Sequence, residues 1–136
     1  MKYRLLDILA CPMCKGFPLE LIVLEKEKKE RQLPSKPPLC ELYCAYKGKS
    51  LEELKARKEA APCEECFQYE ITTAVLYCRN CGRWFPVING IPHMLPDYIR
   101  KDEKERELEF LRKYADRLPE KIVKKGLPHN LSEENK

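Results

Sequence analysis

Eight cysteines, grouped in four close pairs, constrain the fold of this chain more than any other feature of its sequence. In the two outer pairs, Cys11–Cys14 and Cys78–Cys81, two residues separate the cysteines. This spacing lets two thiolates face one ion, as in a zinc knuckle. A knuckle supplies two ligands, whereas structural zinc takes four in a tetrahedron. The outer pairs together therefore predict one four-thiolate zinc site.

The inner pairs, Cys40 with Cys44 and Cys63 with Cys66, predict a second zinc site. In a nested arrangement, the outer pairs share one ion and the inner pairs share the other. In a sequential arrangement, each pair would share its ion with the next pair along the chain. We favour the nested arrangement because the outer pairs are alike in form and the inner pairs flank one short helix.

Other states of the cysteines are also possible. Disulfides or a degenerate site are the alternatives for the inner four, and free thiols in a core are the alternative for the outer four. Two four-thiolate sites would leave no position for water or substrate, which indicates structural rather than catalytic zinc.

Apolar and β-branched residues beside the outer pairs predict a small antiparallel sheet. We expect strands over 17–24, 70–77 and 84–88. Asn89-Gly90 is a strong signal for a tight turn into an extended segment, which Pro92 keeps at a sheet edge. A short helix is expected over residues 3–9. The predicted fold class is α+β, a zinc-ribbon domain formed by residues 1–24 and 76–96 with flanking helices.

The segment 25–75 is expected to be an inserted helical lobe that carries the inner cysteines. Its first residues, 25–31, are almost wholly charged and predict a surface excursion. Ser50 followed by Glu53 has the form of a capping box, which predicts a helix that ends near Ala61.

Residues 97–136 are expected to form a C-terminal helical extension. Leu108, Leu111, Ala115 and Leu118 recur at helical spacing and predict an amphipathic helix over 97–118. Its apolar stripe needs a surface to cover, on the ribbon or on another chain. A further short helix is expected over 119–123, and a polar, frayed tail over 129–136.

The charge pattern argues against a dominant nucleic-acid-binding face. The formal charge is +4, but each four-thiolate zinc site lowers it by two, so that two sites would bring it to zero. The basic residues are also interleaved with glutamates rather than gathered in a stripe.

No catalytic residue is expected in this chain. Its five glycines form no Gly-x-Gly loop after a strand, and His93 has no obvious acid or nucleophile beside it in the sequence. The first residues lack the apolar stretch of a signal peptide, and no segment reaches the length of a membrane span. We therefore expect a cytoplasmic protein, in which reduced thiols favour zinc.

Three strings of residues resemble the Trm-type methyltransferase activator family, whose members are small zinc-ribbon subunits. They are Leu-Leu-Asp-Ile-Leu-Ala-Cys-Pro at 5–12, Leu-Tyr-Cys-Arg-Asn-Cys at 76–81 and Phe-Pro-Val-Ile-Asn-Gly-Ile-Pro-His-Met-Leu-Pro at 85–96. The four inner cysteines, in the segment 25–75, depart from the pattern of this family.

The resemblance implies a non-catalytic subunit that binds S-adenosylmethionine-dependent methyltransferases, which modify tRNA, ribosomal RNA or a translation release factor. Such a subunit stabilises its partner in a heterodimer by extending the partner's β-sheet, and contacts RNA only through that partner. The ribbon is too small to bury all its apolar residues, and an extended edge exposes backbone groups. The expected partner-binding residues are Leu5, Ile8, Ile88, Ile91, Met94 and Leu95.

Two other functions fit the residues. A nucleic-acid-binding zinc ribbon would bind RNA directly, with a steep dependence on salt. A rubredoxin-like electron carrier would hold iron between its two knuckles.

Overall fold

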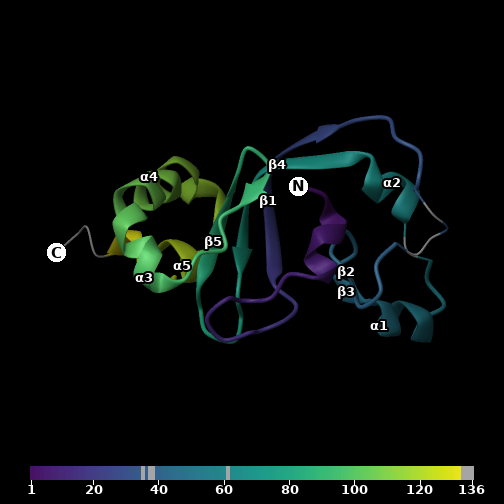
Figure 1. The fold of residues 1–136 in the computed structure, drawn as a ribbon, viewed down its shortest axis with the longest axis horizontal. Coiled ribbons are helices and arrows are strands. Elements are labelled where there is room, and N and C mark those ends of the chain that lie inside the picture. The colour runs from purple at the N-terminus through teal and green to yellow at the C-terminus, as the bar shows by residue number, and fades with distance from the viewer. Residues whose placement is uncertain (35, 37–38, 61, 133–136) are drawn as a thin grey trace.

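A four-stranded antiparallel sheet forms the centre of the computed structural model, which describes residues 1–34, 36, 39–60 and 62–132. The strand order is β1-β4-β5-β6. The strands are β1 (Glu20–Lys28), β4 (Tyr69–Tyr77), β5 (Trp84–Ile88) and β6 (Ile91–Pro92). Helices flank this sheet, so the predicted α+β class is confirmed (Figure 1).

The pair of β1 and β4 extends further than the sequence indicated. The two strands pair in antiparallel register from Glu20 opposite Tyr77 to Lys28 opposite Tyr69. The sheet therefore continues through both ends of the segment 25–75. We expected a surface excursion to begin at residue 25, and this is wrong for residues 25–28. These charged residues belong to β1, because β4 pairs with their backbone.

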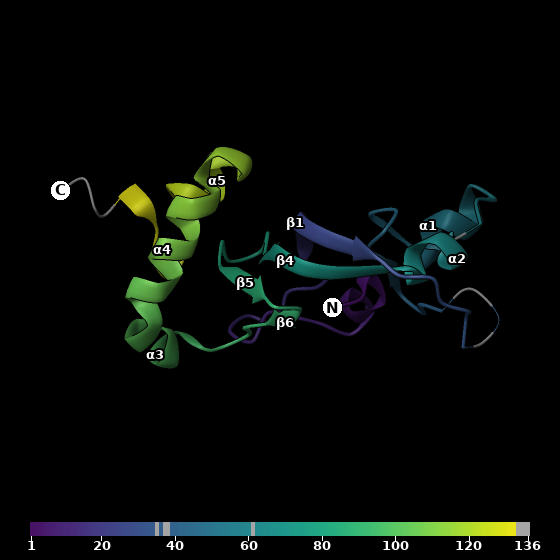
Figure 2. The same ribbon diagram turned by 90° about the horizontal axis from the view of Figure 1, so that it is seen from above.

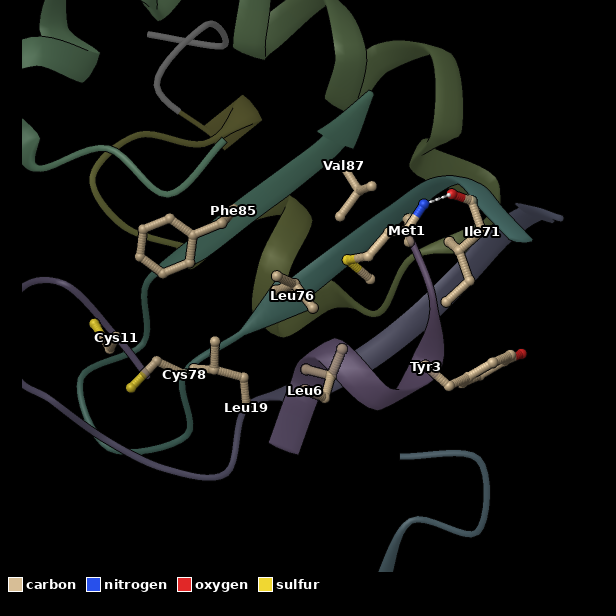
Figure 3. Close-up of a cluster of buried hydrophobic side chains, with 11 residues drawn as sticks. Met1, Tyr3, Leu6, Cys11, Leu19, Ile71, Leu76, Cys78, Phe85 and Val87 are labelled. Carbon is tan, nitrogen blue, oxygen red and sulfur yellow. Dashed lines mark hydrogen bonds between the residues drawn. The ribbon is translucent and has the colours of Figure 1, made fainter. Parts of the chain in front are cut away.

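One face of the sheet packs against the N-terminal segment (Figure 3). The 3-10 helix η1 (Tyr3–Asp7), which confirms the short helix expected near residues 3–9, buries Tyr3 and Leu6 against this face. The α-amino group of Met1 donates a hydrogen bond of 2.9 Å to the Ile71 carbonyl. The main members of this core are Met1, Tyr3, Leu6, Cys11, Leu19, Ile71, Ala74, Leu76, Cys78, Phe85 and Val87.

The opposite face packs against the C-terminal helices, so the amphipathic stripe covers the chain's own sheet (Figure 2). The single helix expected over 97–118 is instead a series of short segments. They are α3 (Asp97–Arg100), η2 (Lys101–Glu103), α4 (Lys104–Tyr114) and η3 (Ala115–Arg117). The expected short helix after Pro119 is α5 (Glu120–Val123). No helix in the described residues has the length and apolar character that crossing a membrane requires.

The polar tail after α5 is partly built into the core, which corrects the expectation of a frayed end at 129–136. The His129 carbonyl accepts a 2.9 Å hydrogen bond from Trp84 Nε1. The Asn130 side chain donates a 3.0 Å bond to the Gly126 carbonyl. Both His129 and Asn130 are buried. Residues 133–136 of that expectation lie outside the described residues.

The inserted lobe lies at the opposite end of the sheet from the C-terminal helices (Figures 1 and 2). It contains β2 (Tyr43–Cys44), β3 (Lys49–Ser50), α1 (Leu51–Ala56) and α2 (Cys63–Phe67). The predicted cap is present, since Ser50 Oγ accepts a 3.1 Å bond from the Glu53 amide. The helix ends earlier than expected because Lys58 has a φ of +56°, and Ala61 lies outside the described residues.

Asp7 of η1 attaches the lobe to the N-terminal segment. Its carboxylate accepts hydrogen bonds from the backbone amides of Glu41, Leu42 and Tyr43 at 2.9, 2.6 and 2.7 Å. Partial burial alone would raise the pKa of Asp7, but these three donors and the nearby Arg4 lower it below its ordinary value. The ionised form of Asp7 therefore stabilises the fold.

A buried charged cluster joins the C-terminal segment to the sheet. Arg100 is fully buried, and its Nε donates to both carboxylate oxygens of Glu107 at 2.9 and 3.2 Å. The guanidinium carbon lies 5.0 Å from the ring centroids of Trp84 and Phe85. Burial lowers the pKa of Arg100, and the charge of Glu107 opposes that change.

Replacing Asp7 by Asn should destabilise the protein by about 1–2 kcal/mol at pH 7, because the three amides lose a charged acceptor. The folded pKa is lowered, so the stabilisation is complete above the unfolded pKa of about 3.9 and is lost as the pH falls through the folded value. Urea unfolding at a series of pH values measures this. The exposed Asp116→Asn is the control, and a deficit that does not shrink below about pH 4 would contradict the assignment.

Replacing Glu107 by Gln should cost about 3 kcal/mol in the free energy of unfolding, because it leaves the buried Arg100 charge without its counter-charge. Chemical denaturation at neutral pH measures the loss. Glu105→Gln on the exposed side of α4 should change stability by less than about 0.5 kcal/mol. Equal effects of the two variants would show that the ion pair contributes nothing.

Candidate metal centre

Four cysteine sulfurs from the two ends of the ribbon meet in one compact cluster. The Sγ atoms of Cys11, Cys14, Cys78 and Cys81 all lie within 4.8 Å of one another. The Sγ atoms of Cys11 and Cys81 are 3.7 Å apart, and those of Cys14 and Cys78 are 3.4 Å apart. A tetrahedron with zinc–sulfur bonds of about 2.3 Å has edges of about 3.8 Å. The cluster therefore has the dimensions of a four-thiolate zinc site.

The two turns that carry these cysteines have the same backbone geometry. The carbonyl of Cys11 accepts a 2.8 Å bond from the amide of Lys15, and that of Cys78 accepts a 2.8 Å bond from the amide of Gly82. The residue four positions after each first cysteine has a positive φ, +64° for Lys15 and +80° for Gly82. Gly82 thus has a backbone conformation that favours glycine, and Lys15 adopts the equivalent conformation in the first turn.

Gly16 has a different role, which is to leave room for the sulfurs. A Cβ at this position would lie 2.8 Å from Cys78 Sγ and 3.3 Å from Cys14 Sγ. The Gly16 amide also donates a 3.4 Å bond to Cys14 Sγ. Only a glycine lets the backbone approach the cluster this closely.

The surroundings of the cluster favour thiolates unequally. A hydrogen bond from the Asn80 side chain and another from the Gly16 amide help to lower the pKa of Cys14 to about 6. Burial raises the pKa of Cys78 to about 12 and also raises that of Cys11. A divalent cation at the centre would supply the charge that ionises such buried thiols. The donor set and its burial thus fit zinc.

Arg83 and Asn80 are parts of this site that sequence reasoning missed. The Arg83 guanidinium interacts with the Cys81 sulfur, and Asp97 fixes it through bonds of 2.9 and 2.8 Å. Asp97 raises the pKa of Arg83. A cation here offsets the negative charge of a four-thiolate centre. The sequence signal for both was position, because Asn80 lies between Cys78 and Cys81 and Arg83 lies two residues after Cys81.

The structure also brings the four inner cysteines to one place. Cys40, Cys44, Cys63 and Cys66 all line a small cavity of about 10 Å³ beneath η1. Their sulfurs are farther apart than those of the outer cluster. Among the described residues, the outer four are the one group of possible metal ligands whose ligand atoms all lie within 4.8 Å of one another. The two outer cysteine pairs thus meet each other, as the nested arrangement predicts, and not the inner pairs, as the sequential arrangement would require.

The residues expected to bind a partner lie around the β5–β6 turn. Leu5 and Ile8 line a groove of about 670 Å³ that extends to Gly90 of this turn. Ile88 and Ile91 line a second groove, of about 980 Å³, between the turn and α4. Ile8 and Ile91 are 76% and 62% exposed. Met94 packs partly against the core, and Leu95 is half-buried.

Comparison with known protein families agrees with these features. The sequence model of the family described as "Trm112p: Trm112p-like protein" matches residues 2–90. The chain belongs to the Trm112p-like family. A comparison with curated proteins gave no match.

Membership of the Trm112p-like family supports, in general, a role as a methyltransferase activator. The match includes both knuckles, the whole inserted lobe and the strands β1, β4 and β5. The helices α3, α4 and α5 lie beyond the matched residues. The helices beyond the matched residues thus cover one face of the sheet.

Replacing Gly16 by Ala should weaken zinc binding at the outer cluster by about tenfold or more, because the added Cβ displaces the sulfurs of Cys14 and Cys78. Competition with a chromophoric chelator measures the affinity. Gly48→Ala is the control, because it adds a Cβ to a glycine of the inserted lobe, outside the outer cluster, and this Cβ would meet no atom within 4 Å. Unchanged affinity in Gly16→Ala would contradict the steric argument.

Proposed function

We propose that this protein is a zinc-binding, non-catalytic subunit that activates and stabilises S-adenosylmethionine-dependent methyltransferases. Its partners would be cytoplasmic enzymes that modify tRNA, ribosomal RNA or a translation release factor. The protein would form a heterodimer with each catalytic subunit and contact RNA only through it. The observation that carries this proposal is an open, apolar sheet edge in a chain of the Trm112p-like family.

The edge strand β6 can accept a further strand. Ile91 pairs with Ile88 across a turn in which Asn89 and Gly90 have φ values of +52° and +76°, and the His93 amide bonds to the Pro86 carbonyl at 2.9 Å. Backbone groups of alternate residues point to opposite sides of a strand. The Pro92 carbonyl and the Met94 amide are therefore directed away from β5, where a strand of the partner would bond them.

Apolar side chains on both sides of this edge complement the backbone groups. Leu5 and Ile8 lie on one side of the β5–β6 turn, and Ile88 and Ile91 lie on the other. Burying an exposed isoleucine contributes about 1.5–3 kcal/mol. A catalytic subunit that covers these side chains would hide apolar surface of its own at the same time. This explains how the small subunit would stabilise the enzyme.

The zinc centre supports this surface from behind. The outer cysteines fix η1 relative to β4 and β5, because Cys11 follows η1 and Cys78 lies between these two strands. Closed coordination by four thiolates suits a structural ion. The metal would therefore position the docking surface and take no part in methyl transfer.

Coexpression tests the proposed function directly. The chain would be expressed together with candidate catalytic subunits for tRNA, ribosomal RNA and release-factor methylation from the same organism. We expect at least one of them to gain both soluble yield and transfer of labelled methyl groups. Coexpression that changes neither property for any candidate would argue against the proposal. RNA binding by the isolated chain, with a steep salt dependence, would favour a nucleic-acid-binding ribbon instead.

Surface variants test the docking edge. Ile8→Lys and Ile91→Lys should each weaken the heterodimer by about tenfold or more, which corresponds to about 1.4 kcal/mol. Leu42→Lys is the matched control, because Leu42 and Ile91 are both 62% exposed but Leu42 lies in the inserted lobe. Titration calorimetry of the purified subunits measures the dissociation constants. Equal weakening by all three variants would place the interface elsewhere.

A further inference from the structure

We propose that Cys40, Cys44, Cys63 and Cys66 bind a second zinc ion as a closed four-thiolate centre inside the inserted lobe, between the strands β1 and β4. These side chains line one cavity of about 10 Å³, which is about the volume that a single water-sized particle occupies. Cys40, Cys44 and Cys63 are buried, and Cys66 is half-buried. Four cysteines that line a space of this size offer a site to one ion and to nothing larger.

The turn at Cys44 has the backbone geometry of the two knuckles of the outer cluster. The Cys44 carbonyl accepts a 2.8 Å bond from the amide of Gly48, four residues later, as the carbonyls of Cys11 and Cys78 do in their own turns. Gly48 has a φ of +70°, again in the range of the equivalent residues. Cys44 pairs with Lys49 at the end of this turn. The lobe therefore presents Cys44 in the same way as the outer turns present their first ligands.

The other side of the cavity is formed by the helix α2. Cys63 and Cys66 are three residues apart in this helix, so both side chains lie on one face. The Leu39 amide donates a 3.5 Å bond to Cys63 Sγ. The Gly16 amide makes a similar bond of 3.4 Å to Cys14 in the outer cluster. Such amide–sulfur bonds orient the ligands of a metal site and offset the charge of its thiolates.

The described residues of the lobe form only a small core of their own. The buried apolar residues of its core cluster are Leu51 and Leu54, with Cys40 and Cys44 beside them. Small units with few buried apolar side chains often use a disulfide or a metal as a cross-link. One ion bound by residues from both halves of the lobe would provide that cross-link.

The inner sulfurs must approach one another to bind the ion, since they are more widely separated than those of the outer cluster. Rotation about χ1 moves a cysteine sulfur between staggered positions without moving its backbone. All four cysteines line the same small cavity, so such rotations could bring their sulfurs together there. Tyr3 and Arg4 of η1 line the same cavity, which means that the ion would also hold the lobe against the segment that carries Leu5 and Ile8.

Metal counting on the purified full-length chain tests this site without reference to any partner. Protein expressed in zinc-supplemented medium and purified under reducing conditions should contain two zinc ions per chain by plasma mass spectrometry. The double variant Cys40→Ser with Cys63→Ser should contain one, and Cys11→Ser with Cys78→Ser should also lose one. One zinc in the unsubstituted protein, or an unchanged count in the Cys40/Cys63 variant, would overturn the proposal.

A pair of substitutions at one position separates ligation from misfolding. Cys66→His keeps a zinc ligand, so that it should retain two zinc ions, whereas Cys66→Ser should retain only one. Cobalt substitution should give sulfur-to-metal charge-transfer absorption that is lower in Cys66→Ser than in the unsubstituted chain. If Cys66→His and Cys66→Ser lose zinc equally, the residue is not a ligand. A thiol count tests for disulfides in protein that is prepared without reductant, denatured and stripped of metal. All eight cysteines should be free thiols. A disulfide among the inner four would also overturn the proposal.

Discussion

The closure of the outer sulfur cluster is the interaction on which the rest of the structure depends. It joins residues 64 and 70 positions apart through Cys14 with Cys78 and Cys11 with Cys81. The entropic cost of closing such loops grows only logarithmically with their length, so one ion can hold the N-terminal segment on the sheet. Cys11 and Cys78 are also members of the main core. A metal ion bound at this cluster would therefore stabilise the same arrangement of η1, β4 and β5 that hydrophobic packing stabilises.

The inserted lobe and the proposed docking surface meet at η1. Asp7 bonds to three consecutive amides of the lobe, while Leu5 and Ile8 of the same segment face an open groove. The inner cysteines lie beneath η1 on the lobe side. A change in the order of the lobe would therefore be transmitted to η1 through direct contacts. Through this connection the insert would help to shape the proposed docking surface, even if no residue of the insert contacts the partner.

Features encoded within a few residues could be predicted from the sequence, whereas features that need a distant partner could not. The turn at Asn89-Gly90 and the cap at Ser50 follow from local conformational preferences, and both are present. The strand from Glu25 to Lys28 depends on β4, which lies more than 40 residues away in sequence. Burial of His129 likewise requires Trp84 and the C-terminal helices around it. Polar composition alone indicates exposure, so the sequence favoured a frayed tail there.

The two edges of the sheet differ in a way that favours docking at β6. At the other edge, β1 ends in four exposed charged residues over 25–28, and charges on an edge strand oppose the addition of another strand. Strand β6 is only two residues long, and Pro92 removes one amide from it. A short edge with few free backbone groups is a poor template for pairing with another copy of itself. A partner that binds there must add contacts to Ile8 and Ile91, so specificity would arise from the side chains beside the edge rather than from the edge alone.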